Sequence, residues 1–459
     1  MSSRMREVAA LVCAAALVAG GTSCTSKAQV QIERADYRLT VSPDGHHILK
    51  SDGSPFFWLG DTAWELFHRL DREEIDFYLE DRANKGFNVI QAVVLAELDG
   101  LRTPNAYGEV PLIELDPELP NEAYFAHVDY VVERAAALGM HVGMLPTWGD
   151  KFNLRWGVGP EIFTPENARA YGQFLGARYA NDPVIWILGG DRNPEEEGDL
   201  EVIRSMARGI RERVGDAQMM TYHPMGGSKS WTWFHDDEWL DLNMFQSGHG
   251  ARDQPNYQLT AEGYALEPVK PVLDGEPRYE DHPVDWSPEK GWFDAFDVRQ
   301  AAYWSILAGA AGHTYGNHNI WQMWEPGREP ISSARTPWRE AVHHPGSSQM
   351  GLLKAFFETR QWMRLVPDQS LIVGEARSGG EDIRAAREAD GSFAVLYTPY
   401  GHALVVDLTL LSADSVNAAW FDPRDGEYIP VGRFETMGGT TFDPPGEPER
   451  GNDWVLVLE

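Results

Sequence analysis

Two carboxylates stand directly after apolar runs of the chain. Asp191 follows residues 184–189, and Glu276 follows residues 269–274. A carboxylate that closes a buried strand is costly unless it is paired or used. Hydrolysis of a glycosidic bond needs two such groups, one that protonates the leaving oxygen and one that attacks the anomeric carbon or activates water. We therefore expect Asp191 and Glu276 to form a catalytic pair.

Alternation along the two runs favours the same pair. Residues 185, 187, 189 and 191 would share one face of an extended strand, and so would Val272, Asp274 and Glu276. An N-cap is the alternative role for Asp191, because Arg192-Asn193-Pro194 follows it. Asp274, deeper on the same face, is the alternative nucleophile, followed by Glu280.

Further polar and aromatic residues stand at the ends of the other apolar runs. Trp faces stack on sugar rings, while amides, His and carboxylates fix the hydroxyls. Asp61 could instead accept hydrogen bonds from backbone N–H groups. Arg192 and Arg278 could bind a substrate carboxylate or adjust the pKa values of the two catalytic carboxyl groups. The expected substrate-binding residues are Asp61, Trp64, Gln91, Trp148, Arg192, His223, Gln246, Arg278, Asn317 and His318.

No metal or cofactor is expected in this site. His223, His249, His313 and His318 show no tight two-His spacing with a carboxylate, so they are expected to bind hydroxyls. Cys13 and Cys24 are the only cysteines of the sequence, and both lie in the N-terminal segment. A thiol nucleophile and a disulfide are therefore excluded for the mature chain.

Eight short apolar runs, with helix-compatible stretches between them, would position these residues. Eight strand–helix alternations predict an α/β fold of the (β/α)8 TIM-barrel type, with its site at the carboxyl ends of the strands. A doubly wound open sheet is less favoured, because no glycine-rich phosphate loop follows the first run. The expected strands are 56–60, 88–95, 141–146, 184–189, 218–223, 242–246, 269–274 and 312–316, and the clearest helices are 73–85, 124–138, 165–179 and 200–214.

The pattern of the sequence changes near residue 366, from alternating strand-like and helix-like segments to strand-like segments and turns. Strand-like runs at 392–398, 403–410, 416–421 and 454–458 alternate with turn signals such as Asp425-Gly426. This predicts a small C-terminal β-sandwich, preceded by a helix over 349–363 that closes the barrel. The expected domains are an N-terminal segment at 1–28, a catalytic domain at 29–365 and the β-sandwich at 366–459.

The N-terminus is typical of a bacterial export signal. Arg4 and Arg6 precede an apolar run over 8–19, and small residues lead to Cys24. The run is too short to span a bilayer. Gly21-Thr22-Ser23-Cys24 resembles a lipoprotein cleavage site with Gly in place of the usual Leu. We expect an exported protein, either anchored by a lipid on Cys24 or secreted to the periplasm or beyond.

The charge balance limits the partners of the chain. Its 70 acidic and 39 basic residues give a formal net charge of -31. Such a chain is repelled by nucleic acid and by anionic membrane surfaces. A carbohydrate fits better, either neutral or, if Arg or Lys gathers in the site, acidic.

Several motifs resemble one known family. Leu59-Gly60-Asp61-Thr62-Ala63-Trp64, residues 86–91, residues 186–193 and Leu273-Asp274-Gly275-Glu276-Pro277 are similar to the apiosidase-like catalytic domain of glycoside hydrolase family 140. Residues 420–426 look like the collagen-binding type of domain found in the same proteins. The resemblance implies a retaining hydrolase of plant or pectic glycans that removes a terminal apiose-like sugar, with Asp191 as acid/base and Glu276 as nucleophile.

Two other functions stay open at this point. The barrel could hydrolyse another glycan, and the loops 96–121 and 225–238 would then determine the substrate specificity. It could also be an inactive protein whose β-sandwich binds glycan or collagen, although both expected carboxylates are present. The β-sandwich itself is expected to act mainly as a packing partner of the barrel.

Overall fold

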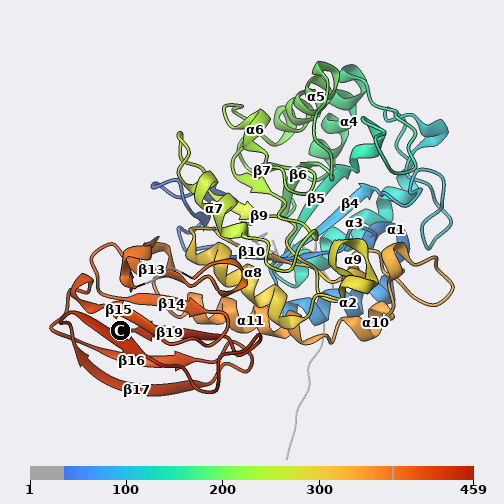
Figure 1. Cartoon of the computed structure of the whole chain (residues 1–459). Coiled ribbons are helices and arrows are strands. Elements are labelled where there is room, and N and C mark those ends of the chain that lie inside the picture. The colour runs from blue at the N-terminus through green and yellow to red at the C-terminus, as the bar shows by residue number, and fades with distance from the viewer. Residues whose placement is uncertain (1–35, 375–376) are drawn as a thin grey trace, which may run out of the picture. The chain divides into compact units, whose positions relative to one another are not determined.

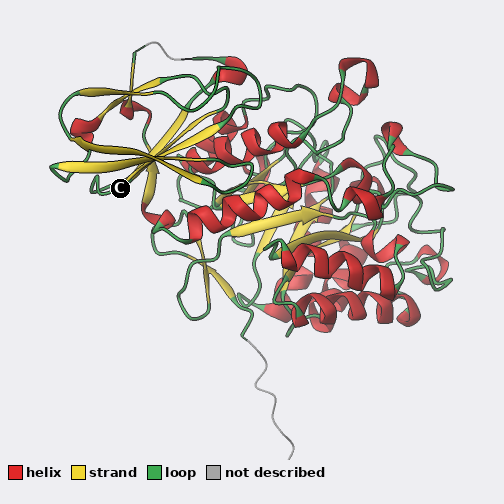
Figure 2. Cartoon of the chain, turned by 90° about the horizontal axis from the view of Figure 1, so that it is seen from below, coloured by secondary structure: helices red, strands yellow, loops and turns green. Residues whose placement is uncertain are grey.

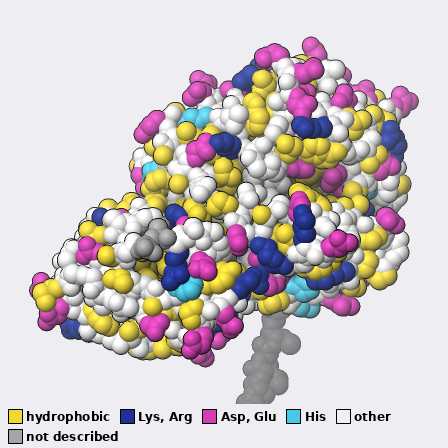
Figure 3. All heavy atoms as spheres, in the orientation of Figure 1, with side chains coloured by type: hydrophobic (Ala, Val, Ile, Leu, Met, Phe, Trp, Pro, Cys, Tyr) yellow, Lys and Arg dark blue, Asp and Glu magenta, His cyan; other side chains and the backbone are white. Residues whose placement is uncertain are grey.

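The computed structural model describes residues 36–374 and 377–459. The expected export segment 1–28, with Cys24, lies outside these residues. Among the described helices, none has the length and apolar character needed to cross a membrane. On the face drawn in Figure 3, Asp and Glu side chains are spread over the surface, with Lys and Arg among them.

Eight parallel strands lie at the centre of the first domain, with helices around them (Figure 1). Six are paired in the order β10-β3-β4-β5-β6-β7, and β8 pairs with β9. Single backbone hydrogen bonds bridge the two gaps, from Asp241 N to Met220 O and from Ala311 N to Val272 O. The strands thus close into the predicted (β/α)8 barrel. They are β3 (Trp58–Thr62), β4 (Val89–Leu95), β5 (His141–Thr147), β6 (Val184–Gly189), β7 (Met220–His223), β8 (Asn243–Phe245), β9 (Val272–Asp274) and β10 (Gly312–Tyr315).

All eight strands coincide with expected runs, although the first is displaced as a whole by two residues. That strand covers residues 58–62 instead of 56–60, so Asp61 lies inside it rather than after it. Asn88 explains part of this register. Its side chain accepts from Leu59 N and donates to Phe57 O, which fixes the entry of the strand.

The main helices cover the outside of the barrel (Figure 2). Several begin at a capping box, in which the N-cap side chain accepts from a backbone N–H three residues on and the residue there returns the bond. Asp71 with Glu74 and Asp294 with Asp297 are examples. The helices are α2 (Arg72–Asn84), α3 (Glu122–Ala137), α4 (Pro165–Arg178), α5 (Glu197–Val214), α7 (Asn256–Tyr264), α8 (Ala295–Leu307) and α11 (Pro345–Glu358).

Alternation along β6 divides the core into an inner and an outer layer. Ile185 and Ile187 belong to the cluster inside the barrel, whereas Trp186 and Leu188 pack in the cluster that contains α3, α4 and α5. Each of these side chains is essentially buried, which stabilises the fold by about 2 kcal/mol apiece. The polar residues that follow Gly189, at the carboxyl end of β6, therefore lie at the barrel mouth.

Antiparallel strands follow after residue 364 in two sheets. Four of them, β14 (Ala394–Thr398), β15 (Leu404–Asp407), β16 (Ser415–Phe421) and β19 (Trp454–Leu458), coincide with expected runs. The sequence reading missed β11 (Leu365–Pro367), β12 (Ile372–Val373), β13 (Arg384–Glu388), β17 (Tyr428–Glu435) and β18 (Gly439–Phe442). The strand β13 reads Arg-Ala-Ala-Arg-Glu, which carries no β-branched or aromatic signal.

The first domain and the C-terminal sheets share one hydrophobic cluster. It includes residues of α8, α11, β14 and β19. The ring of Tyr303 stacks on that of Tyr397 at 4.7 Å, and buried Arg299 forms two hydrogen bonds to the carboxylate of Asp453. The C-terminal sheets are therefore a packing partner of the barrel through α8 and α11.

Candidate active site

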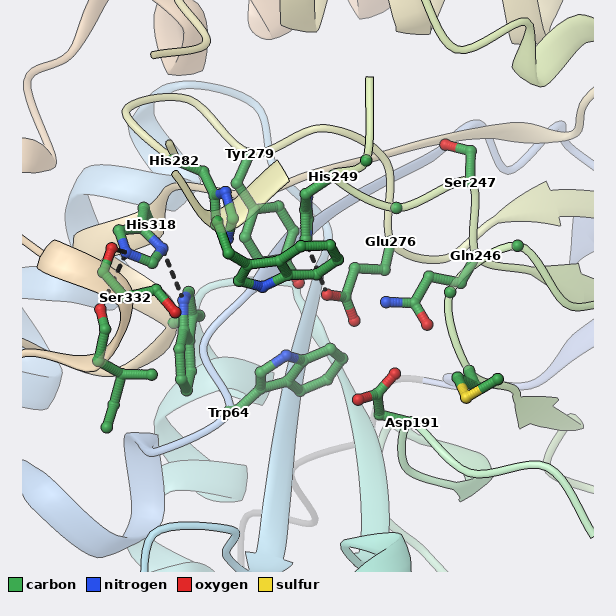
Figure 4. A pocket seen from close by; sticks show the side chains of 18 of the residues that line it. Trp64, Asp191, Gln246, Ser247, His249, Glu276, Tyr279, His282, His318 and Ser332 are labelled. Atoms are coloured by element: carbon green, nitrogen blue, oxygen red, sulfur yellow. Dashed lines mark hydrogen bonds and ion pairs between the residues drawn. The ribbon is translucent and has the colours of Figure 1, made fainter. Parts of the chain in front are cut away.

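A pocket of about 620 Å³ lies at the carboxyl ends of the barrel strands. Its lining combines five Trp, three His and three carboxyl groups with a few small and polar residues. In Figure 4 the carboxylates of Asp191 and Glu276 extend into the same space, with Trp64 beside them. The chemically informative lining residues are Trp64, Glu97, Trp148, Trp156, Asp191, Gln246, His249, Glu276, Tyr279, His282, Trp286, His318 and Trp321.

Asp191 reaches the pocket through a left-handed turn rather than by strand alternation. Gly189, Gly190 and Asp191 have φ values of 96°, 92° and 56°. Glycine is required at the first of these, because a Cβ there would lie 2.4 Å from the carbonyl oxygen of His223. Asp is one of the residues that tolerate the left-handed region. The left-handed backbone of the Gly-Gly-Asp sequence therefore directs the Asp191 carboxylate into the pocket.

Arg192 and Trp156 fix the turn from outside. The Arg192 guanidinium donates to the carbonyl oxygens of Asn153, Asp191 and Trp156 and lies 3.8 Å from the centre of the Trp156 ring. The Trp156 side chain also hydrogen-bonds the Asp191 carboxyl. Arg192 is thus a scaffold for the acid, and it is not one of the lining residues. Its predicted role in binding substrate is wrong.

Glu276 is held by two histidines. Its Oε1 lies 3.0 Å from His249 Nε2, and its Oε2 lies 3.1 Å from His223 Nε2. The backbone N–H of Asp191 donates to the other ring nitrogen of His223 at 3.3 Å, so the proton of a neutral His223 is on Nε2, the nitrogen that faces Glu276. His223 therefore touches both members of the predicted pair.

The two carboxyl groups have opposite electrostatic environments. Burial alone would raise the pKa of Glu276, but the contacts of its carboxylate with His223 and His249 lower it below its ordinary value. Burial and the neighbouring charge of Glu276 raise the pKa of Asp191. One carboxyl is thus kept ionised and the other protonated, which is the division of roles that an acid and a nucleophile need.

Asp274 does not compete with Glu276 for the pocket. Leu273 belongs to the cluster inside the barrel, so its neighbour Asp274 points outward. The Asp274 carboxylate accepts from Ser247 Oγ at 2.7 Å and from Asn256 Nδ2 of α7 at 3.1 Å. The expectation that Asp274 and Glu276 share a face is wrong, because the strand ends at Asp274 and Gly275 breaks the alternation. 

Glu280 is likewise occupied elsewhere. It accepts from the Tyr315 hydroxyl at 2.6 Å and from Gly346 N at 3.1 Å, and it is not among the lining residues. This leaves Glu276 as the carboxylate that β9 delivers to the pocket.

Five expected substrate-binding residues reach the site. Trp64, Trp148, Gln246 and His318 line the pocket, and His223 contacts both carboxyl-bearing residues. The loops expected to choose the substrate also contribute, through Glu97 in 96–121 and through Met225, Gly226 and Gly227 in 225–238.

Asp61 and Gln91 are not in the pocket. Asp61 points outward from β3 and is fully buried against α2, where Tyr78 Oη donates to it at 2.6 Å and Arg82 forms an ion pair with it. The Gln91 side chain lies inside the barrel and donates to the carbonyl oxygen of Gly275 at 3.0 Å. Both predictions of substrate contact are wrong, because one residue holds a helix and the other holds the backbone before Glu276.

Arg278 and Asn317 are structural as well. Arg278 is buried and donates to Gln300 Oε1 at 2.9 Å and to the carbonyl of Arg252, away from the pocket. Asn317 caps the short helix α9 (His318–Trp321), where its side chain accepts from Asn319 N. Neither lines the pocket, so these two predictions are also wrong.

Among the lining residues that sequence reasoning missed are Glu97, Trp156, His282 and Trp286. Glu97 stands two positions after β4, so the rule that selected Asp191 would have found it. Trp156, His282 and Trp286 stand in long loops, and nothing in their spacing relates them to a strand end. Trp286 is 54% exposed and has a φ of 56°, which leaves its ring at the pocket.

Three histidines form a row along one wall, in which His249 and His282 are stacked and His318 meets His282 edge-on (Figure 4). The rings of His249 and His282 are 4.3 Å apart, and those of His282 and His318 also 4.3 Å. His318 accepts from Trp321 Nε1 and donates to backbone carbonyls, while His282 donates to Pro283 O. Among residues 36–374 and 377–459 no three His, Cys, Asp or Glu side chains are grouped as metal ligands.

Comparison with known proteins gives a consistent answer. Residues 42–364 match the family model described as "Apiosidase-like, catalytic domain", and residues 366–459 match "Putative collagen-binding domain of a collagenase". A comparison with curated proteins gave no match.

Two solved structures are similar over most of their length. One, described as a glycoside hydrolase, is 33% identical with a TM-score of 0.84, and the match covers 92% of this chain and 96% of that one. The other, described as a glycoside hydrolase family 5 protein from Bacteroides vulgatus, is 34% identical with a TM-score of 0.85 and 92% coverage of both chains.

Proposed function

The chain belongs to the apiosidase-like family of glycoside hydrolases, and from that premise we propose that it removes a terminal apiose-like sugar from a plant cell-wall or pectic glycan. We propose a retaining mechanism with Asp191 as general acid/base and Glu276 as nucleophile. Its assignment to glycoside hydrolase family 140 is part of the proposal.

One observation carries the proposed mechanism. Asp191 and Glu276 come from the ends of two different strands, line one pocket, and have pKa values displaced in opposite directions. A raised pKa keeps Asp191 protonated, so that it can donate to the glycosidic oxygen. A lowered pKa keeps Glu276 ionised, so that it can attack the anomeric carbon.

The reaction then proceeds in two steps. Glu276 displaces the leaving group and forms a glycosyl ester while Asp191 passes its proton to the departing oxygen. Asp191, now a carboxylate, takes a proton from water, which attacks the anomeric carbon and releases Glu276. His249 Nε2 is hydrogen-bonded to Glu276 and His223 Nε2 lies 3.1 Å from its other oxygen, so both rings stabilise Glu276 as a leaving group in the second step.

Substrate binding is proposed to rest on the aromatic walls. Trp64 and Trp148 lie beside the carboxyl pair, with ring centres 5.3 Å apart, and offer faces to a terminal sugar. The side chain of Gln246 and the row of His249, His282 and His318 offer polar atoms to the sugar hydroxyls.

A panel of glycosides tests this function. Wild-type protein would be assayed on aryl glycosides and on pectic oligosaccharides with and without apiose, and the first-formed anomer would be read by proton NMR. We expect release of a terminal sugar with retained configuration. Release of an inverted sugar would contradict the mechanism, and no turnover of any glycan would favour a binding protein.

We also propose that the protein is exported and carries a lipid on Cys24. The support is the sequence alone, with Arg4 and Arg6 before an apolar run and small residues before the cysteine. In a bacterial host, the Cys24→Ser variant should move from the membrane fraction to the soluble fraction. Equal membrane association of both forms would contradict lipidation.

A further inference from the structure

Glu97 carries the third carboxyl group of the pocket, and the proposed mechanism does not use it. The residue stands two positions after β4, is partly exposed and lines the pocket. The carboxyl groups of Asp191 and Glu276 are held by a Trp and by two His side chains. By contrast, the part of the chain that the structure describes donates no hydrogen bond to the carboxyl group of Glu97. An unpaired polar group in a pocket is costly unless a ligand supplies its partner.

The ammonium group of Lys151, which lies near Glu97, is already bonded to other groups. It donates to Asp150 Oδ1 at 2.7 Å and to Ala96 O at 2.8 Å. Burial and the neighbouring carboxyl groups, Asp191 first among them, outweigh the charge of Lys151 and raise the pKa of Glu97 to about 8. The carboxyl group of Glu97 is therefore uncharged at neutral pH. Such a group can both donate and accept a hydrogen bond, as a sugar hydroxyl can.

Buried groups fix the backbone on both sides of Glu97. On one side, Lys151 holds the carbonyl oxygen of Ala96. On the other side, the N–H of Leu98 donates at 3.2 Å to Oε1 of Glu65, whose side chain is fully buried. Glu97 is thus presented to the pocket from a fixed segment of chain. A group fixed in this way loses little backbone entropy when it binds a ligand.

The strand that carries Glu97 lies between the strands that carry Trp64 and Trp148. In the sheet β4 is flanked by β3 and β5, and Trp64 and Trp148 follow these two strands. Backbone hydrogen bonds join Val93 N to Trp64 O at 3.2 Å and Trp148 N to Leu95 O at 3.1 Å. These are the two rings proposed to stack on the terminal sugar. The hydroxyls at the rim of a stacked sugar would therefore lie near the carboxyl group of Glu97.

We propose that Glu97 is a substrate-binding residue whose carboxyl group forms a hydrogen bond with one hydroxyl of the terminal sugar. The inference rests on the proposed function, because it concerns the sugar that Asp191 and Glu276 would release. In this contact the carboxyl group of Glu97 is uncharged. A sugar that lacks this hydroxyl leaves the group without a partner in the pocket, so its kcat/KM should be about ten-fold or more lower.

A set of monodeoxy substrates tests the contact. Wild-type protein and Glu97→Ala would be assayed on an aryl glycoside of the terminal sugar and on analogues with the same leaving group that each lack one hydroxyl. We expect Glu97→Ala to lower kcat/KM about ten-fold or more on the parent glycoside. On one analogue the variant and the wild type should be nearly equal, because the contact is already absent. Equal losses on all substrates, or no loss on any, would overturn the inference.

Three further variants separate hydrogen bonding from charge and from packing. Glu97→Gln keeps a side chain that donates and accepts but does not ionise, so its kcat/KM should stay within about three-fold of the wild type. Glu97→Leu fills the same space without polar atoms and should behave as Glu97→Ala does. Glu118→Ala, which removes an exposed carboxylate of the same loop that does not line the pocket, is the control. A loss in Glu97→Gln as large as in Glu97→Ala would overturn the uncharged contact.

The failure of this inference is distinguishable from failure of the proposed function. Activity of the wild-type protein on the parent glycoside reports hydrolysis independently of Glu97. If that activity is present and Glu97→Ala loses the same factor on every analogue, only the inference fails. If the wild-type protein hydrolyses no glycoside, the proposed function fails and the inference fails with it.

Discussion

His223 Nε2 lies 3.1 Å from the Oε2 atom of Glu276, and the backbone N–H of Asp191 donates to the opposite nitrogen of the same ring. One imidazole thus joins the two ends of the proposed catalytic pair. Its backbone is equally constrained, because Gly190 N donates to His223 O.

Removing this imidazole should weaken the nucleophile. In His223→Ala the carboxylate of Glu276 loses its contact with the His223 ring, so its pKa rises and the acid limb of the kcat/KM profile moves to higher pH. We expect kcat to fall by roughly 10²–10³-fold. His343→Ala, which removes an exposed histidine, is the control. An acid limb at the wild-type position would contradict this role for His223.

The pH profile of the wild type should be bell-shaped and broad. Activity needs Glu276 ionised and Asp191 protonated. It should therefore be lost as pH falls through the lowered pKa of Glu276 and as pH rises through the raised pKa of Asp191. The measurement is kcat/KM against pH on an aryl glycoside. An alkaline limb in the ordinary Asp range near 4 would contradict the assignment of Asp191 as the acid.

Replacement of Asp61 should lower the stability of the protein, whereas replacement of Trp64 should weaken substrate binding. Asp61→Asn disrupts a buried pair with Arg82, so we expect a loss of roughly 3–5 kcal/mol in the free energy of unfolding and an unchanged KM. Trp64→Ala should raise KM by roughly three- to ten-fold, because a stacking face is lost. Urea unfolding and steady-state kinetics measure both. A raised KM in an Asp61→Asn variant that still folds would indicate that Asp61 takes part in substrate binding.

The contact between the barrel and the C-terminal sheets should be sensitive at one ion pair. Asp453→Ala leaves Arg299 buried without its partner, so we expect the free energy of unfolding to fall by roughly 3–5 kcal/mol. Asp390→Ala breaks the exposed pair with Arg364 and should leave the free energy of unfolding almost unchanged. Equal unfolding curves for the two variants would show that the contact contributes little stability.

The sequence predicted the barrel well because its strands are short apolar runs separated by helix-compatible stretches. All eight coincide with observed strands, and Asp191 and Glu276 follow two of them. The strand β13 has a polar sequence, and β17 is interrupted by Pro430 and Gly432, so neither gave such a signal.

The candidate site could be predicted only where a side chain stands close to a strand end. Trp64 and Gln246 meet that condition, whereas Trp156 and Trp286 reach the pocket through long loops. Asp61, Arg192 and Arg278 satisfied the condition but pair with the scaffold. Alternation does not reveal this when a strand is displaced by two residues, as β3 is, or is followed by a glycine, as β9 is.

Azide rescue tests the central claim most directly. Asp191→Ala and Glu276→Ala would be assayed on an activated aryl glycoside with and without sodium azide, and the anomeric configuration of the glycosyl azide would be determined by NMR. The account predicts that both variants lose turnover and that azide restores it, with retained configuration for Asp191→Ala and inverted configuration for Glu276→Ala. Full activity of either variant without azide would contradict the catalytic pair.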